Sequence, residues 1–250
     1  MSASEKTGER VALVTGAGRR IGRAIALRLH ALDFNVAIHC HLSVTEATDL
    51  AHELNAVRRA SACVFRADLM QTVSLPLLVN EVAAWHGRLD VLVNNASVFI
   101  RSSNVVHDEG VWDALWSTNV KAPQVLSAAS FPWLSQHQGV IVNITDIHAD
   151  RPLQDYGVYS QTKAALTLQT KDLAREFAPK VRVNAVAPGA MMWPEGDNQL
   201  SMQQQQSIVD KTPLCRHGDP QWIAHAVQFC VDNEFMTGQV IRVDGGRSLR

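Results

Sequence analysis

The stretch that decides the fold is Val11-Ala-Leu-Val-Thr-Gly-Ala-Gly-Arg-Arg-Ile-Gly22, near the start of a chain of 250 residues. Its opening apolar run is typical of a buried strand, and the glycines after it predict a tight turn. The residues from Ile21 onward have the apolar spacing of a helix. A glycine-rich turn between a strand and a helix is typical of a unit whose free helix N–H groups bind a dinucleotide pyrophosphate.

The rest of the chain continues this alternation of short apolar runs and longer helical segments. Seven runs are predicted as strands: Val11–Thr15, Asn35–Cys40, Ala62–Arg66, Val91–Asn94, Val140–Ile144, Val181–Val186 and Val240–Val243. Six segments are predicted as helices: Ile21–Leu32, Thr45–Val57, Ser74–Trp85, Val111–Leu134, Tyr159–Phe177 and Trp222–Cys230. This alternation predicts an α/β fold of Rossmann type, with a seven-stranded parallel sheet and helices on both faces.

Composition limits the choice of partners and compartments. The 23 Lys and Arg residues are scattered and nearly balanced by 24 Asp and Glu, which argues against nucleic acid and membrane partners and favours a small molecule. Residues 1–9 are a polar tail without the apolar core of a signal peptide, so we expect a single domain over 10–250 in the cytoplasm. The cysteines are far apart in the sequence, so we expect neither disulfides nor a metal site.

One segment, 188–212, breaks the strand and helix rhythm. It contains Pro188-Gly189, Trp193-Pro194 and Glu195-Gly196, and it is predicted to be a mobile flap on the substrate side of the sheet. The run Gln203–Gln206 is equally consistent with a plain solvated helix.

The residues around the first two strand ends favour NADPH as the cofactor. Gly16 permits the tight turn and Gly22 permits close packing of helix on strand. Enzymes that prefer NAD place a carboxylate at the end of the second strand, and none stands in the run His39-Cys-His-Leu-Ser43. Four side chains there are predicted donors to a 2′-phosphate: Arg19, His39, His41 and Ser43. His39 and His41 are equally consistent with strand-end residues that face solvent.

The predicted reacting groups are Tyr159 and Lys163, which share one helix face. A neighbouring ammonium favours the phenolate, so we expect Lys163 to lower the pKa of Tyr159 and make it a usable proton donor. Tyr156, the only other tyrosine, could share the face of Lys163 if the helix began earlier. Asp146 stands thirteen residues before Tyr159, and a carboxylate there suits a nitrogen heterocycle better than a developing alkoxide.

These motifs resemble the short-chain dehydrogenase/reductase family over nearly the whole chain. That family usually has a glycine where Arg20 stands and a serine where Asp146 stands. Arg20, Asp146 and the run Ser97-Val-Phe99 resemble its pteridine reductase branch. Many members of that branch have an arginine where this chain has Leu42, which leaves the strength of the NADPH preference open.

The resemblance also implies roles for further residues. Cofactor contacts are expected from Gly16, Arg19, Arg20, Ile21, Gly22, His39, His41, Ser43, Asp68, Leu69, Asn95, Ala96, Ser97, Tyr159, Lys163, Pro188 and Gly189. Substrate contacts are expected from Arg20, Ser97, Phe99, Asp146, Tyr159 and Trp193, with Phe99 packing on the pterin ring or serving only as a core residue. Asn119 is expected to hold a catalytic water beside Lys163 or to kink its helix. Family members are commonly homotetramers, and Arg250 could then reach a neighbouring subunit's pocket.

We therefore predict an oxidoreductase of folate metabolism that reduces a pterin with NADPH, using Asp146, Tyr159 and Lys163. One alternative is an NADPH-dependent reductase of a 3-oxoacyl or similar ketone, with the hydroxyl of Thr145 in place of the missing serine. A second is an NADP-binding sensor without catalysis, against which the intact pair of Tyr159 and Lys163 argues. The sequence does not say which pterin or folate is reduced.

Overall fold

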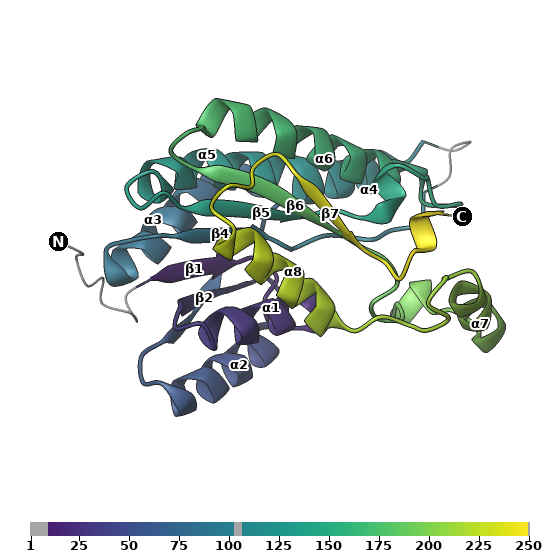
Figure 1. Cartoon of the computed structure of the whole chain (residues 1–250), viewed down its shortest axis with the longest axis horizontal. Coiled ribbons are helices and arrows are strands. Elements are labelled where there is room, and N and C mark those ends of the chain that lie inside the picture. The colour runs from purple at the N-terminus through teal and green to yellow at the C-terminus, as the bar shows by residue number, and fades with distance from the viewer. Residues whose placement is uncertain (1–9, 103–106, 250) are drawn as a thin grey trace.

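The computed structural model describes residues 10–102 and 107–249, so the predicted polar tail and Arg250 lie outside the described residues. Seven strands form one parallel sheet in the order β3-β2-β1-β4-β5-β6-β7 (Figure 1). The strands are β1 (Val11–Val14), β2 (Asn35–Cys40), β3 (Ala62–Arg66), β4 (Val91–Asn94), β5 (Val140–Ile144), β6 (Arg182–Pro188) and β7 (Val240–Val243). The predicted fold class and parallel sheet are confirmed.

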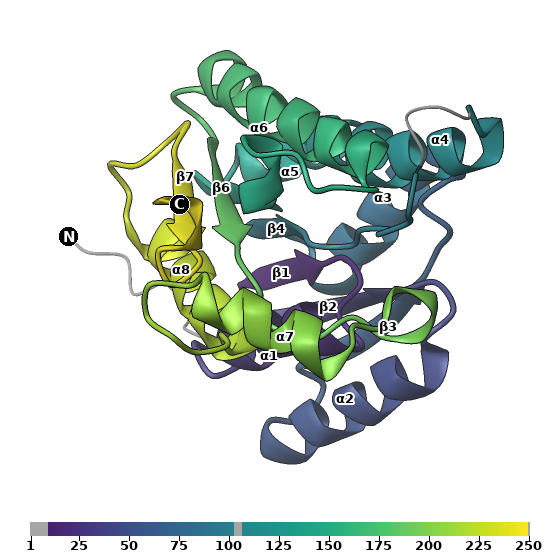
Figure 2. The same cartoon turned by 90° about the vertical axis from the view of Figure 1, so that its right-hand side faces the viewer.

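Helices cover both faces of this sheet (Figures 1 and 2). Helices α1, α2 and α8 pack on one face, and α3, α5 and α6 pack on the other. The helices are α1 (Arg20–His30), α2 (Val44–Val57), α3 (Leu75–His86), α4 (Glu109–Trp116), α5 (Ala122–Leu134), α6 (Gly157–Phe177), α7 (Met202–Asp210) and α8 (Pro220–Asp232).

The two-sided covering explains why β1 is apolar at every position. Ala12 and Val14 point into the core beneath α1 and α8, whereas Val11 and Leu13 point into the core beneath α3, α5 and α6. Side chains alternate between the faces of a strand, so a strand buried on both sides has no polar positions to mark its period.

The strand order places the site. The chain crosses from β3 at one edge back to β4 beside β1, so the helices that follow β1 and β4 lie on opposite faces of the sheet. Such a switch point leaves a crevice at the carboxyl ends of these strands, where ligands of open α/β sheets bind.

Several helical segments differ from their predictions. The predicted helix 111–134 consists of α4, a π-helical segment Ser117–Lys121 and α5. Helix α6 begins at Gly157, two residues before the predicted start. The predicted flap contains α7, which has a capping box between Ser201 and Gln204 and no buried residue, so the Gln run lies in a solvated helix.

The four cysteines are free thiols. In the part of the chain that the structure describes, no helix combines the length and apolarity that a membrane crossing requires.

Candidate active site

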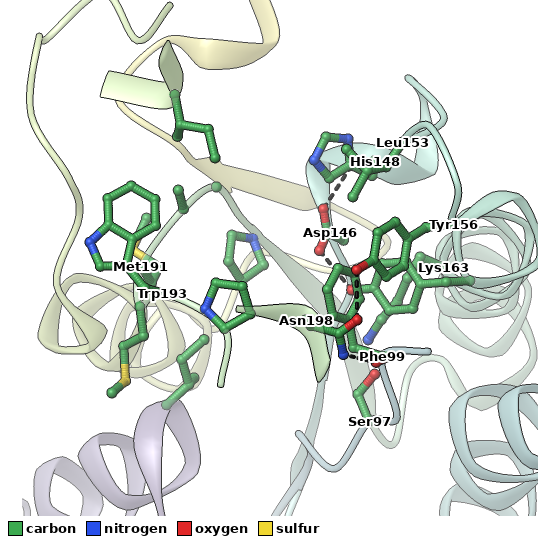
Figure 3. Close-up of a pocket in the computed structure, with 18 of the residues that line it drawn as sticks. Ser97, Phe99, Asp146, His148, Leu153, Tyr156, Lys163, Met191, Trp193 and Asn198 are labelled. Carbon is green, nitrogen blue, oxygen red and sulfur yellow. Dashed lines mark hydrogen bonds between the residues drawn. The ribbon is translucent and has the colours of Figure 1, made fainter. Parts of the chain in front are cut away.

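A cavity of about 510 Å³ lies at the carboxyl ends of β4, β5 and β6 and beside the start of α1. It brings together most residues predicted for the reacting end: Arg20, Ile21, Asn95, Ser97, Phe99, Asp146, Tyr159, Lys163, Pro188, Gly189 and Trp193. Asp146 and Lys163 lie on one side of it, and Met191 and Trp193 lie on the other (Figure 3). All six residues predicted to contact the substrate therefore line one cavity.

Asp146 and Tyr159 form the polar centre of this cavity. The Tyr159 hydroxyl donates to Asp146 Oδ2 at 2.7 Å, and the backbone N–H of His148 donates to Oδ1 at 2.8 Å. Burial raises the pKa of Tyr159 well above its ordinary value, and the negative charge of Asp146 raises it further. The prediction that Lys163 brings this pKa nearer neutral is wrong for the chain by itself, because burial and the charge of Asp146 both act in the opposite direction. Tyr159 is a neutral phenol whose hydrogen is donated to Asp146.

Lys163 lies near the ring of Tyr159 and is only 2% exposed. Its Nζ lies 5.7 Å from the centre of the Tyr159 ring and donates to the carbonyl oxygen of Ile144 at 2.9 Å. Burial lowers the pKa of Lys163 to about 8, although the charge of Asp146 opposes the change. A buried ammonium with one backbone acceptor has spare donors for a ligand hydroxyl.

Thr145 and Tyr156, the alternatives considered for the missing serine and for Tyr159, form hydrogen bonds elsewhere. Thr145 donates its hydroxyl to the carbonyl oxygen of Val186 at 3.1 Å, so the hydroxyl is held by β6. Tyr156 precedes α6, and its hydroxyl donates to Asn198 Oδ1 at 2.6 Å. Tyr159, and not Tyr156, therefore contacts Asp146.

Aromatic rings form one wall of the cavity. Phe99 stacks on Tyr156 with ring centroids 4.2 Å apart and meets the edge of Tyr159 at 4.8 Å. Asn198 Nδ2 donates to the carbonyl oxygen of Phe99 at 2.8 Å, so Asn198 links the flap to this wall (Figure 3). Asn198 was not predicted from the sequence, because no local pattern marks it. Tyr156 was considered only as an alternative proton donor to Tyr159, and not as part of an aromatic wall.

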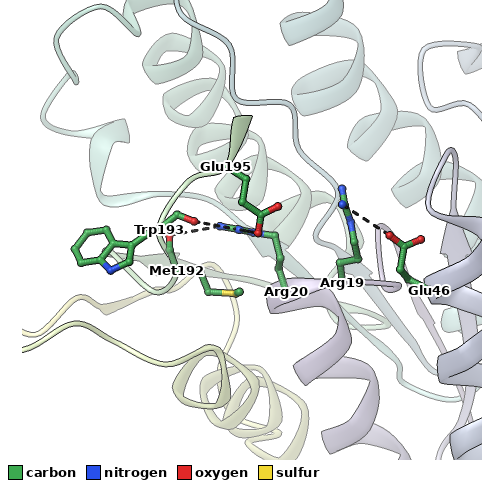
Figure 4. A network of polar contacts seen from close by, with 6 residues as sticks. All are labelled: Arg19, Arg20, Glu46, Met192, Trp193 and Glu195. Atoms are coloured by element: carbon green, nitrogen blue, oxygen red, sulfur yellow. Dashed lines mark hydrogen bonds and ion pairs between the residues drawn. The ribbon is translucent and has the colours of Figure 1, made fainter. Parts of the chain in front are cut away.

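Arg20 holds the opposite side of the flap (Figure 4). Its guanidinium donates to the carbonyl oxygens of Trp193 and Met192 at 3.2 and 3.4 Å and to Glu195 Oε1 at 3.0 Å. The Arg20 backbone has a φ of 55°, in the left-handed region where the family's glycine would be unstrained. Glu195 was not predicted as a site residue.

The glycine turn has the close packing expected of it. A Cβ on Gly22 would lie 2.2 Å from the carbonyl oxygen of Gly16, and Gly16 itself has a φ of 62°. Arg19 precedes α1 without a side-chain cap, and the first turn of α1 has no acidic residue. The positive end of the helix dipole is thus left to an external anion.

His39 does not have the predicted role of a phosphate donor, nor does it face solvent. The side chain is 1% exposed, its Nδ1 accepts from the backbone N–H of Gly16 at 3.2 Å, and its Nε2 lies 3.2 Å from the carbonyl oxygen of Ala67. Burial lowers the pKa of His39 to about 4, so the ring is neutral and Nε2 carries the hydrogen. His39 braces the glycine turn from below.

The other predicted phosphate donors lie at the surface. Arg19 approaches Glu46 at 3.8 Å, and His41 approaches Asp68 at 3.8 Å (Figure 4 shows the first pair). Glu46, in the first turn of α2, is a carboxylate that the sequence reasoning did not consider. Of the remaining predicted residues nearby, Ser43 precedes α2 without capping it through its side chain, and Leu69 is buried.

Asn95 and Ala96 hold the ends of β1 and β4 together. Asn95 Nδ2 donates to the carbonyl oxygens of Thr15 and Gly16, and the backbone N–H groups of Asn95 and Ala96 donate to the Thr15 hydroxyl. These contacts place the strand ends that border the cavity.

Asn119 lies in the π-helical segment and is buried. Its Oδ1 accepts from Ser97 Oγ and from the backbone N–H of Val98, and its Nδ2 donates to Thr162 Oγ1. This placement agrees with the helix-kink interpretation and ties the loop after β4 to α6.

Comparisons with known proteins identify the family. Residues 16–248 match the family model described as enoyl-(acyl carrier protein) reductase, and the chain belongs to the short-chain dehydrogenase/reductase family. It is 34% identical to a putative ketoacyl reductase of the granaticin polyketide synthase of Streptomyces violaceoruber, with 96% of each chain covered. It is also 34% identical to the 3-oxoacyl-[acyl-carrier-protein] reductase FabG of Staphylococcus aureus, covering 94% of this chain and 96% of the relative.

A solved structure adds a third comparison. The crystal structure of FolM alternative dihydrofolate reductase 1 from Brucella canis, in complex with NADP, superposes with a TM-score of 0.90 at 33% identity. The superposition covers 98% of this chain and 96% of that one. The two relatives found by sequence are named as ketoacyl reductases, whereas the neighbour found by structure is named as a dihydrofolate reductase.

Proposed function

We propose that this protein reduces a pterin or folate ring with NADPH. The observation that carries the proposal is Asp146, which accepts the Tyr159 hydroxyl hydrogen at 2.7 Å in the cavity. A carboxylate there can accept from the amino group and ring N–H of a pterin, whereas it would repel the oxyanion of a ketone reduction. The FolM enzyme of Brucella canis, an alternative dihydrofolate reductase, supports the same reading.

The glycine turn fits a dinucleotide. The helix N-terminus of α1 has neither a side-chain cap nor an acidic residue, and Gly22 allows the turn to approach it closely. Arg19 is half-exposed beside the turn, where it could bind a 2′-phosphate. Its guanidinium would then pair with the phosphate in place of Glu46. Lys163, Asn95 and Gly189 line the cavity where the nicotinamide end would lie.

When bound, NADPH supplies a hydride to a carbon of the ring. The ring nitrogen joined to that carbon must then gain a proton, and the hydroxyl of Tyr159 is a proton-bearing group at the polar centre of the cavity. Asp146 orients the phenol and the ring through hydrogen bonds, and Lys163 provides positive charge near the phenolate that remains. Phe99 and Tyr156 form an aromatic wall suited to a flat heterocycle.

A second candidate is reduction of a 3-oxoacyl group, which the ketoacyl reductases among the relatives favour. Such chemistry requires a hydroxyl aimed at the substrate carbonyl. Thr145 was the residue considered for that role, but its hydroxyl donates to the carbonyl oxygen of Val186. The contacts at the cavity therefore favour the pterin.

The test is NADPH consumption by the purified protein with dihydrobiopterin, dihydromonapterin, dihydrofolate and a 3-oxoacyl thioester. We expect turnover of at least one pterin at a higher kcat/KM than the thioester. Turnover of the thioester alone would overturn the substrate class and leave the family standing.

We further propose that the protein is a cytoplasmic homotetramer. Light scattering of the purified protein would test the oligomeric state, and fractionation of cells would test the location.

A further inference from the structure

A second cavity, of about 220 Å³, adjoins the first and has a strongly basic lining. His148 and Arg247 line both cavities, and Arg151 and Lys211 line only the second. We propose that this basic pocket binds a carboxylate or phosphate on the side chain of the substrate while its ring lies against Asp146. The inference rests on the proposed function and narrows it to pterins that carry an anionic side chain.

The positive charge of the basic pocket is uncompensated by the residues that form it. None of its described lining residues is acidic. Among the carboxylates close by, Asp150 pairs with Arg242 and Asp210 accepts from Gln206. Asp244 accepts from backbone N–H groups after β7 and also interacts electrostatically with Arg247, so it offsets part of the charge of that one residue. Gathered cations without a carboxylate among them are the usual setting for a bound anion.

Three separate parts of the chain build the pocket. His148 and Arg151 follow β5, Lys211 follows α7 directly, and Arg247 follows β7. In Figure 1, α7 and the yellow C-terminal end of the described chain both lie at the right-hand end of the molecule. Because the sequence separates these cations widely, charge runs along the chain give no sign of the cluster.

Two of the lining side chains are held in place. Arg247 donates from one terminal nitrogen to the carbonyl oxygen of Ile208 at 2.9 Å, which orients its guanidinium and leaves further donors for an anion. The Nδ1 of His148 donates to the carbonyl oxygen of Arg151 at 3.0 Å, which orients the ring; its Nε2 can donate to an anion only in the imidazolium form, in which both ring nitrogens carry a hydrogen. Arg151 and Lys211 are exposed and can adjust to different anions.

The basic pocket lies beside Asp146. His148 stands two residues after Asp146, and its backbone N–H donates to that carboxylate at 2.8 Å, so their Cα atoms are at most roughly 7 Å apart. Figure 3 shows His148 next to Asp146. The basic pocket is therefore next to the place of a ring at Asp146, on the side where a substituent of that ring would extend.

The experiment compares the double variant Arg151→Gln/Lys211→Gln with the wild type. Its control is Lys171→Gln/Arg175→Gln, which removes the same charge from exposed positions on α6. Steady-state kinetics are measured with dihydrofolate, whose tail ends in carboxylates, with dihydroneopterin phosphate, and with uncharged dihydrobiopterin. We expect kcat/KM for an anionic substrate, divided by that for dihydrobiopterin, to fall about tenfold in the double variant and not in the control.

The choice of anion is read from the same data. A fall for dihydrofolate alone identifies a carboxylate tail, and a fall for the phosphate ester alone identifies a phosphate. A ratio that stays within twofold of the wild type for both would overturn the proposal while leaving pterin reduction intact. Arg151→Lys/Lys211→Arg, which keeps both charges, should retain the wild-type ratio.

A binding measurement separates this inference from the proposed function. Calorimetry with p-aminobenzoylglutamate and with inorganic phosphate needs no turnover. If no pterin is reduced but the wild type binds one of these probes and the double variant does not, the basic pocket stands and the proposed function fails. If the wild type binds neither probe, the basic pocket fails whatever the kinetics of dihydrobiopterin show.

Discussion

Replacing Lys163 with methionine should make the stability of the protein depend less on pH. Lys163 is buried, and its pKa is lowered to about 8 from an ordinary value of 10.5. Methionine has a similar length and no charge, so Lys163→Met removes the titrating group while it fills most of the same space. The contact with the carbonyl oxygen of Ile144 is lost at every pH and so does not alter the pH dependence.

The size and sign of the effect follow from the two pKa values. Below pH 8 the lysine is protonated in both states, and the folded state bears the full cost of a buried charge, about 3 kcal/mol at about 1.4 kcal/mol per pH unit. Between pH 8 and 10.5 the unfolded chain holds a proton that the folded chain has released, so stability rises with pH. Between pH 7 and pH 10 the wild type should therefore gain about 2 kcal/mol relative to Lys163→Met.

Urea unfolding of both proteins at pH 7 and pH 10 measures this difference. Lys171→Met, an exposed lysine on the same helix, is the matched control and should show the pH dependence of the wild type. If the difference between wild type and Lys163→Met is the same at both pH values, Lys163 titrates as an ordinary lysine. The reasoning from its burial would then be wrong.

Three further substitutions test other parts of the account. Gly22→Ala places a Cβ 2.2 Å from the carbonyl oxygen of Gly16, so it should lower the free energy of unfolding by about 3 kcal/mol or more and weaken NADPH binding; an unchanged melting temperature would contradict the packing. Arg20→Gly removes the left-handed strain but also the three contacts to the flap, so amide exchange in residues 192–200 should accelerate; unchanged exchange would show that Arg20 does not hold the flap. Tyr159→Phe should lower kcat by about 10²- to 10⁴-fold with little change in the Kd of NADPH, and near-normal turnover would remove Tyr159 from the mechanism.

The sheet was predictable because every strand is a short apolar run between turn signals. Burial on both faces makes β1 apolar throughout and leaves Asn35 and His39 as the polar residues of β2, and such a run can be read from the sequence without a partner strand. Helix boundaries were less accessible. The π-helical segment at Asn119 depends on bonds from its side chain to Val98 and Thr162, which lie far away in the sequence.

The site was predictable where one segment carries the signal, as in the glycine turn and the pair Tyr159 and Lys163. It was not predictable where packing decides the outcome. His39 ends a strand and resembles a surface donor, yet the glycine turn buries it. The pKa of Tyr159 moved opposite to the prediction because spacing along a helix reveals the neighbouring ammonium but not the depth of burial.

The most direct test of the account replaces Asp146 with serine and measures NADPH oxidation with dihydropterins and with a 3-oxoacyl thioester. Serine can still accept the backbone N–H of His148, so the local fold should persist. We predict that the wild type prefers the pterin and that Asp146→Ser loses at least about a hundredfold in kcat/KM for it. A wild type that reduces only the thioester, or a variant that reduces pterins as well as the wild type does, would contradict the central claim.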